Sequence, residues 1–160
     1  MPARAGLQFT YFMTGLQMLL PALMEHSKDE ASLARVAPAV RGEEIWCQLF
    51  SEPSSGSDSA ATRTMAVKDG DHWVLNGQKV WNSGAQASDF GMVIARTDPD
   101  VPKHKGLSAF WLDMKTPGLE VRPIKMMSGD SELNEVFLED VRIPDNQRIG
   151  APGDGWKVVI

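Results

Sequence analysis

The sequence predicts an α+β fold, with a short helical segment followed by an antiparallel β-barrel or sandwich domain. Two observations carry this prediction. Before Gly42, apolar residues recur at helical spacing. After Gly42, the pattern changes to short runs rich in Val, Ile, Thr, Phe and Trp. Glycine and aspartate separate these runs at intervals of about 8–12 residues, as is typical of sandwiches and barrels.

Two helices are expected in the first part of the chain. The second of these helices is predicted over 28–36, as an amphipathic helix with Ser27 as its N-cap. Pro38 and Gly42 are expected to end it. The first helix is indicated by five apolar residues at helical spacing, namely Leu16, Leu19, Leu20, Leu23 and Met24.

The clearest strand is predicted at 72–75, between an Asp-Gly-Asp turn at 69–71 and Asn-Gly at 76–77. Residues of these types tolerate positive φ and can close tight hairpins, so we expect a meander of three strands here. Further strands are expected at 62–67, 92–95, 107–112, 119–124 and 135–142.

Composition narrows the classes of ligand. The 160 residues carry a net charge of −5, which gives no basic surface for nucleic acid or anionic membranes, so a small-molecule ligand is favoured. The apolar stretch at 16–24 is much shorter than the roughly 20 residues of a membrane span. The single cysteine, Cys47, cannot form an internal disulfide, and the three histidines show no metal-ligand spacing with it. We therefore expect a cytoplasmic protein without a metal site and with an inert, buried Cys47 thiol.

The segment from Ser51 to Asp58 follows an apolar run and is dense in hydroxyls and glycine. Such a loop can hold a flat polar ligand, although clusters of this kind also mark ordinary solvent-exposed loops. It lacks the Gly-Lys-Ser/Thr of a phosphate-binding loop and the spaced glycines of a dinucleotide-binding βαβ unit. Glu52 and Asp58 could form an acid–base pair by type, but the sequence fixes neither their separation nor their burial, and Asp58 is expected to cap or brace the loop.

Five motifs follow one another along the chain: Glu-Pro-Ser-Ser-Gly-Ser-Asp at 52–58, Leu-Asn-Gly-Gln-Lys at 75–79, Ala-Arg-Thr at 95–97, Pro-Gly-Leu-Glu-Val at 117–121 and Val-Phe-Leu-Glu-Asp-Val-Arg-Ile-Pro at 136–144. Together they resemble the acyl-CoA dehydrogenase family. The resemblance implies that 45–150 form the middle β-barrel domain, which binds FAD, that 1–44 are the end of an N-terminal helical domain, and that Glu52 and Asp58 are structural. It also implies that 151–160 begin a C-terminal helical domain, which in the family supplies the catalytic base, so we expect this chain to be a fragment without that base.

The same resemblance assigns site residues. Trp81 and Ser83 match a Trp-x-Thr element whose indole packs on the flavin ring and whose hydroxyl approaches N5, although Trp81 taken alone could equally be a core aromatic. Ser57 would contact flavin or the acyl-CoA substrate. Donors at the N1/O2 edge of the ring would stabilise the negative charge that accumulates when hydride arrives. The residues that would border the ring from the first loop are Gln48, Phe50, Ser51, Gly56 and Ser57.

The function implied is α,β-desaturation of an acyl-CoA thioester, in which a carboxylate removes the α-proton and hydride leaves the β-carbon for the flavin. Electrons would pass to an electron-transfer flavoprotein or a similar acceptor, and the parent protein would be a homo- or hetero-oligomer. The chain by itself is expected to be inactive. Two alternatives stay open: another flavoenzyme of the same fold, of the nitroalkane oxidase or flavin monooxygenase type, and a non-catalytic flavin- or acyl-CoA-binding or structural module.

Overall fold

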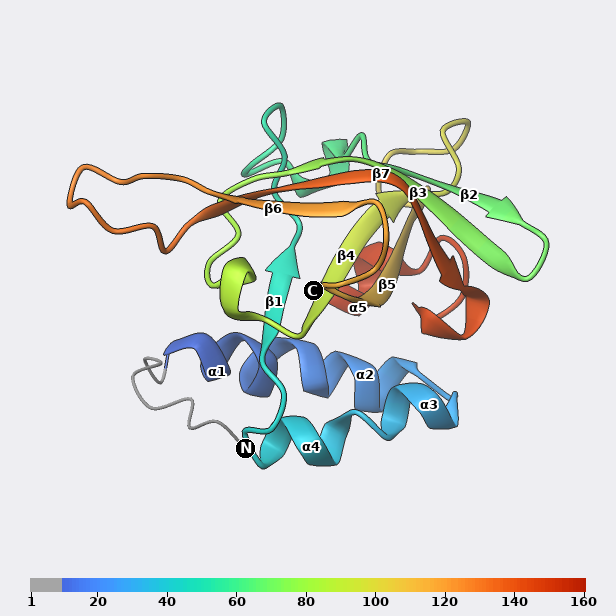
Figure 1. Cartoon of the computed structure of the whole chain (residues 1–160). Helices are drawn as coiled ribbons and strands as arrows, with labels where there is room; N and C mark the ends of the chain where they lie inside the picture. The colour runs from blue at the N-terminus through green and yellow to red at the C-terminus, as the bar shows by residue number, and fades with distance from the viewer. Residues whose placement is uncertain (1–9) are drawn as a thin grey trace.

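The computed structural model describes residues 10–160, in which a layer of helices lies under a bent, eight-stranded β-sheet (Figure 1). The first two α-helices are joined by a π-helical segment, Gly15–Leu19, into one continuous rod. Gly15 allows this rod to approach the sheet closely, since a Cβ there would lie 3.3 Å from the Trp46 Cβ. The α-helices are α1 (Thr10–Thr14), α2 (Leu20–His26), α3 (Glu30–Leu33), α4 (Val36–Val40) and α5 (Gly155–Val159).

The prediction of the second helix is wrong in its details. It is two short helices, α3 and α4, and the N-cap is Asp29 rather than Ser27, because the Asp29 carboxylate accepts hydrogen bonds from the N–H groups of Ala31 and Ser32. Pro38 does not end the helix, since it lies in the first turn of α4, where a missing N–H removes no helical hydrogen bond. The helix ends before Gly42, whose φ of 70° is a conformation that glycine adopts without strain.

The eight strands form one sheet in the order β6-β7-β3-β2-β4-β5-β8, with β1 added beside β4. The β1–β4 pairing is parallel, and a single parallel pair, Met65 with Arg96, joins β2 to β4. The other pairings are antiparallel, as predicted. The strands are β1 (Trp46–Leu49), β2 (Met65–Asp69), β3 (His72–Lys79), β4 (Phe90–Arg96), β5 (Leu107–Asp113), β6 (Leu119–Pro123), β7 (Asn134–Pro144) and β8 (Arg148–Ile149).

The hairpin expected at Asn-Gly 76–77 does not exist. The turn at 69–72 does close a hairpin, but β3 then continues through Gly77 to Lys79 as one strand paired with β7. The register with β7 shifts between Leu75 and Gly77, so the dipeptide forms a β-bulge instead of a turn. A Cβ on Gly77 would lie 2.8 Å from the Thr64 Cα, so this glycine serves a close approach between backbones.

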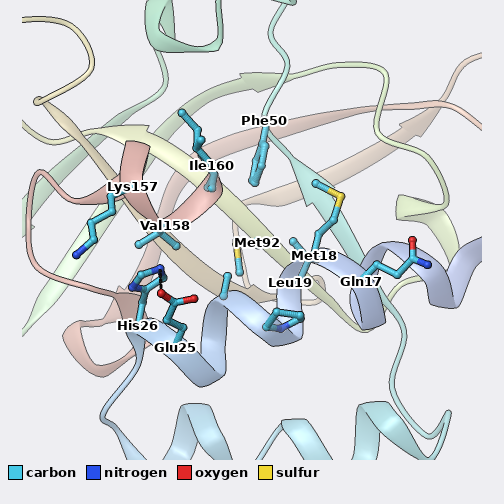
Figure 2. Close-up of a pocket in the computed structure, with 13 residues that line it drawn as sticks. Gln17, Met18, Leu19, Glu25, His26, Phe50, Met92, Lys157, Val158 and Ile160 are labelled. Carbon is cyan, nitrogen blue, oxygen red and sulfur yellow. Dashed lines mark ion pairs between the residues drawn. The ribbon is translucent and has the colours of Figure 1, made fainter.

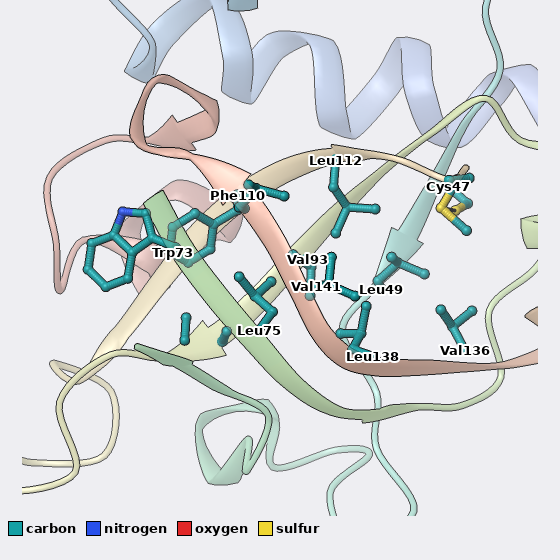
Figure 3. Close-up of a cluster of buried hydrophobic side chains, with 14 of the residues drawn as sticks. Cys47, Leu49, Trp73, Leu75, Val93, Phe110, Leu112, Val136, Leu138 and Val141 are labelled. Atoms are coloured by element: carbon teal, nitrogen blue, oxygen red, sulfur yellow. Dashed lines mark hydrogen bonds between the residues drawn. The ribbon is translucent and has the colours of Figure 1, made fainter. Parts of the chain in front are cut away.

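Two separate apolar cores lie on the two faces of β4. Met92 and Ile94 face the core under the helices, whereas Val93 and Ala95 face the core that includes residues of β3 and β7. Figure 2 shows the first core, where Leu19, Met92 and Val158 gather, and Figure 3 shows the second. Because β4 is covered on both faces, its sequence is apolar throughout rather than alternating.

We predict that Gly77→Ala lowers the free energy of unfolding by about 1–3 kcal/mol, because the added methyl group overlaps the Thr64 backbone. Urea denaturation of the purified chain measures this change. Gly56→Ala is the matched control, since a Cβ there meets no atom within 4 Å, and it should shift stability by less than about 0.5 kcal/mol. Equal effects of the two substitutions would contradict the close approach described for Gly77.

Candidate functional site

The loop after β1 is built around the buried Glu52. Its first residues form a tight turn in which the Glu52 N–H donates to the Ser55 carbonyl oxygen at 2.8 Å and the Ser55 N–H donates back at 3.1 Å. The Glu52 carboxylate accepts the N–H groups of Arg63 at 2.7 Å and Thr64 at 2.9 Å. Both ends of the loop are therefore tied to one side chain.

Lys79, the last residue of β3, provides the charge that balances Glu52. Its Nζ lies 2.8 Å from Glu52 Oε1 and donates to the Phe50 carbonyl oxygen at 3.1 Å. The lysine side chain is fully buried and that of the glutamate is 3% exposed. Burial lowers the pKa of Lys79 to about 8, with Glu52 acting in the opposite direction. Burial by itself would raise the pKa of Glu52, but Lys79 and the two backbone donors hold it below its usual value.

A cleft of about 100 Å³ opens where the ends of β1 and β3 meet, and we call it the Trp81 cleft. The Val80 N–H donates to the Ser51 carbonyl oxygen at 2.9 Å, which fixes the two strand ends side by side. The Asn82 side-chain amide adds a second link, because it donates to the Gln48 carbonyl oxygen at 2.9 Å. The cleft is lined by Thr14, Gln48, Phe50, Ser51, Trp81, Asn82 and Ser83.

Trp81 has an unusual conformation. Its φ is 62°, in the left-handed region, and 58% of the residue is exposed to solvent. A bulky residue at positive φ is strained by about 1–3 kcal/mol and persists only where its surroundings hold it, most often at functional sites. The alternative interpretation of Trp81 as a core aromatic is therefore wrong, since its indole covers the wall of an open cleft.

Two hydroxyl groups of the Trp81 cleft have no partner among the described residues. Within residues 10–160, the hydroxyls of Ser51 and Ser83 have no hydrogen-bond partner. Asn82 Oδ1 is buried and likewise lacks a partner there. The two hydroxyls and the exposed indole face together suit a flat heteroaromatic ring such as flavin.

The structure brings five of the seven predicted ligand residues together: Gln48, Phe50, Ser51, Trp81 and Ser83 all line the Trp81 cleft. Gly56 and Ser57 lie instead on the exposed part of the loop, outside the lining of this cleft.

Two further residues line the cleft without having been predicted as ligand contacts: Thr14, which enters from the helical layer, and Asn82. For Asn82, the only feature of the sequence that pointed to the cleft was its position next to Trp81. No feature of the local sequence pointed to Thr14.

Two other expectations concern single side chains. Asp58 does not cap the following turn, because its carboxylate instead forms an exposed ion pair with Lys103 at 2.6 Å. Cys47 is buried, as predicted, and burial raises the pKa of its thiol to about 12.

Within the described residues, no group of three His, Cys, Asp or Glu side chains is arranged to hold a metal ion. None of the helices there has the length and apolar character needed to cross a membrane.

Comparison with known protein families gives a match over residues 47–141, to the family described as "Acyl-CoA dehydrogenase, middle domain". The chain belongs to the acyl-CoA dehydrogenase family. The matched residues begin within β1 and end within β7, so they include the loop built around Glu52 and most of the Trp81 cleft. Acyl-CoA dehydrogenases are flavoprotein oxidoreductases, which agrees with the chemistry of that cleft.

Individual proteins resemble most of this chain. Acyl-CoA dehydrogenase FadE34 of Mycobacterium tuberculosis is 52% identical over 139 residues, which are 86% of this chain and 19% of the relative. The structure named "Tcur3481-Tcur3483 steroid ACAD" superposes with a TM-score of 0.88 at 30% identity, over 92% of this chain and 38% of that one. The structure of the ChsE4-ChsE5 complex from Mycobacterium tuberculosis superposes with a TM-score of 0.86 at 33% identity, over 92% of this chain and 38% of that one. The chain thus spans less than half the length of these relatives.

We predict that Glu52→Gln and Lys79→Met each cost about 3–5 kcal/mol of unfolding free energy, because each leaves the other charge buried without its partner. The double variant should cost clearly less than the sum. Chemical denaturation of the four proteins gives the coupling energy. Asp58→Asn is the control for an exposed ion pair and should cost less than about 1 kcal/mol. Additive effects of Glu52 and Lys79 would contradict a direct interaction.

The pH dependence follows from the pKa of Lys79. Because this pKa is about 8 in the folded chain and 10.5 in the unfolded one, the unfolded chain binds more protons between these values. Folding stability should therefore rise with pH across this window, relative to Lys79→Met. Unfolding free energies of both proteins, measured from pH 8 to 10.5, test this sign. Parallel curves for the two proteins would show that Lys79 does not titrate in this range.

Proposed function

We propose that this chain forms the flavin-binding wall of an acyl-CoA dehydrogenase that desaturates an acyl-CoA thioester between its α- and β-carbons, with FAD as cofactor. The observation that carries the proposal is the strained, exposed Trp81 in a cleft beside the Ser51 and Ser83 hydroxyls, which have no hydrogen-bond partner within residues 10–160. A structural module would have no reason to hold a tryptophan in this conformation. The family match supports the same assignment.

The residues of the Trp81 cleft have separate tasks in this proposal. When bound, flavin supplies the capacity to accept hydride. Trp81 offers a flat apolar face for its ring, and Ser51 and Ser83 donate hydrogen bonds to its polar edge. Phe50 excludes water from the side of the cleft that adjoins the helices. Gly56 and Ser57 are proposed as contacts from the exposed loop, with Ser57 reaching flavin or the acyl-CoA.

The proton-accepting group of the proposed reaction comes from outside this cleft. Among the described residues that line it, none is a carboxylate or a histidine. Glu52 is close in sequence, but its oxygens are occupied by Lys79 and two backbone donors, and protonation would leave a buried lysine charge unbalanced. We therefore propose that this chain alone binds flavin without turning over acyl-CoA.

The partners of the parent protein follow from the same proposal. Its substrate is an acyl-CoA, and its reduced cofactor passes electrons to an electron-transfer flavoprotein or a related acceptor. We also propose that it is oligomeric, an arrangement that the ChsE4-ChsE5 complex illustrates among the relatives.

The experiment is a titration of the purified chain with FAD, followed by the visible absorption of flavin and by tryptophan fluorescence. We expect saturable binding and a quenching of tryptophan fluorescence that is clearly smaller in Trp81→Phe, because Trp81 is 58% exposed in the cleft, whereas Trp46, Trp73 and Trp111 are buried and Trp156 is half-buried. Trp81→Ala should weaken binding by about two- to tenfold, the value of an aromatic stacking pair.

Ser83→Ala should weaken FAD binding by a similar factor, because it removes from the cleft a donor that has no partner within residues 10–160. Ser128→Ala is the matched control, since Ser128 is exposed in the loop between β6 and β7 and should leave the affinity unchanged. If FAD did not bind, or bound without any effect of Trp81 or Ser83, the chain would be a module without a flavin site.

A further inference from the structure

The turn that carries Trp81 lies beside the start of β7. The Asn82 N–H donates to the Asn134 carbonyl oxygen at 3.0 Å, and the Gly84 N–H donates to the Glu132 carbonyl oxygen at 2.9 Å. Residues 82–84 therefore run alongside residues 132–134, which end the long loop between β6 and β7 (Figure 1). The Trp81 cleft is thus held from behind by a strand that supplies none of its lining residues in the described part of the chain.

Asn134, the first residue of β7, also holds Asn82 with its side chain. Its Nδ2 donates to the Asn82 carbonyl oxygen at 2.9 Å, so one residue pairs with both backbone polar groups of Asn82. Trp81 precedes Asn82 and Ser83 follows it. The two hydrogen bonds therefore fix the peptide planes after Trp81 and before Ser83, and with them the directions of both side chains proposed to contact flavin.

The environment of the Asn134 amide requires a hydrogen-bond donor. Its Nδ2 also donates to the Gln86 side-chain oxygen and, at 3.2 Å, to the Glu132 carbonyl oxygen. Gln86 cannot turn its amide around without losing the bond from its Nε2 to the Ser131 carbonyl oxygen at 3.0 Å. Three oxygens therefore surround the Nδ2 of a fully buried residue. A carboxylate of the same shape would bring a negative charge against these oxygens and donate to none of them.

Trp81 needs such support because its conformation is strained. Its φ is 62° and the residue is 58% exposed, so burial contributes little to holding the indole in place. On the N-terminal side, the bond from the Val80 N–H to the Ser51 carbonyl oxygen fixes the backbone. On the C-terminal side this task falls to Asn134. Without its amide, the Asn82 carbonyl group would be released and Trp81 would relax toward an unstrained φ.

We propose that Asn134 is a positioning residue of the flavin site, which acts through the backbone of Asn82 to keep the Trp81 indole and the Ser83 hydroxyl in the arrangement that flavin requires. This inference rests on the proposed function, because it takes the Trp81 cleft as the place where flavin binds. Asn134 is fully buried and is not among the cleft-lining residues of the described chain, so it acts only through its neighbours.

The first test needs no ligand. The near-ultraviolet circular dichroism of Trp81 is the difference between the spectra of the chain and of Trp81→Phe, and the same difference is then measured with Asn134→Asp present in both proteins. An aromatic side chain gives such a signal only while it is held in a fixed environment. We expect Asn134→Asp to reduce the Trp81 signal by at least about twofold. A signal of unchanged size would overturn the inference.

The second test is the affinity for FAD, measured by absorption titration. Asn134→Asp should weaken binding by about tenfold, because it disturbs two contacts at once. In a chain that already carries Trp81→Ala and Ser83→Ala, the same substitution should change the affinity by less than about twofold, because the contacts that Asn134 positions are gone. An equal loss in both backgrounds would show a general effect on the fold and would overturn the inference.

Ser108→Ala is the matched control for the loss of a buried hydrogen-bonding group. Ser108 is fully buried on β5, where its hydroxyl lies 2.8 Å from the Thr97 hydroxyl and accepts the Gly153 N–H at 3.0 Å. It is not among the lining residues of the Trp81 cleft in the described chain. This variant should lower the melting temperature while leaving the Trp81 signal and the FAD affinity unchanged. Changes in both that match those of Asn134→Asp would contradict a specific role of Asn134.

Gln86→Ala provides a milder variant if Asn134→Asp does not fold. It removes one acceptor that orients the Asn134 amide, from an exposed residue and without burying a charge. The Trp81 signal should fall in this variant as well, and an unchanged signal would overturn the inference.

The two tests separate this inference from the proposed function. A chain that does not bind FAD, but loses the Trp81 signal in Asn134→Asp, retains the positioning of Trp81 and loses the flavin assignment. A chain that binds FAD, and keeps both its affinity and the Trp81 signal in Asn134→Asp, retains the flavin site and loses only the role of Asn134. Far-ultraviolet circular dichroism of each variant establishes that it is folded.

Discussion

The buried ion pair between Glu52 and Lys79 is the interaction on which the rest of the site depends. Taking both charges out of water costs several kcal/mol, which the 2.8 Å contact and the added donors of Arg63 and Thr64 offset. The ion pair selects one conformation of the loop, because Glu52 can accept from all these donors in only one loop conformation. The pair thereby joins the end of β1, the start of β2 and the end of β3 at a single point.

The Trp81 cleft is a geometric consequence of that junction. With Lys79 fixed, the next residues leave β3 beside the end of β1, where Val80 bonds to Ser51 and Trp81 turns into the left-handed region. The indole is then held outside the core with its face open. The same junction places Phe50 in the wall of the cleft, so one buried pair orients the surface proposed for the cofactor.

Much of this arrangement could be predicted from the sequence, and the failures have identifiable causes. Strands β4 and β5 were located because a strand covered on both faces is apolar throughout. The hairpin predicted at Asn-Gly 76–77 was wrong because the same dipeptide is used here for a different purpose. Its glycine allows the close approach to Thr64, and the local sequence does not distinguish this role from a hairpin turn. The ion pair of Lys79 with Glu52 and the place of Thr14 in the cleft were not predicted, because only the packing of the sheet and of the helical layer brings these residues to their partners.

The most direct test of the dependence of the cleft on the buried pair is the FAD affinity of Lys79→Met, measured in conditions where circular dichroism shows that the variant is folded. Lys79 does not line the Trp81 cleft, so any loss must act through the position of the loop and of Trp81. We expect a loss of at least about tenfold, or 1.4 kcal/mol. An unchanged affinity in the folded variant would show that the cleft forms without the ion pair and would contradict its central role.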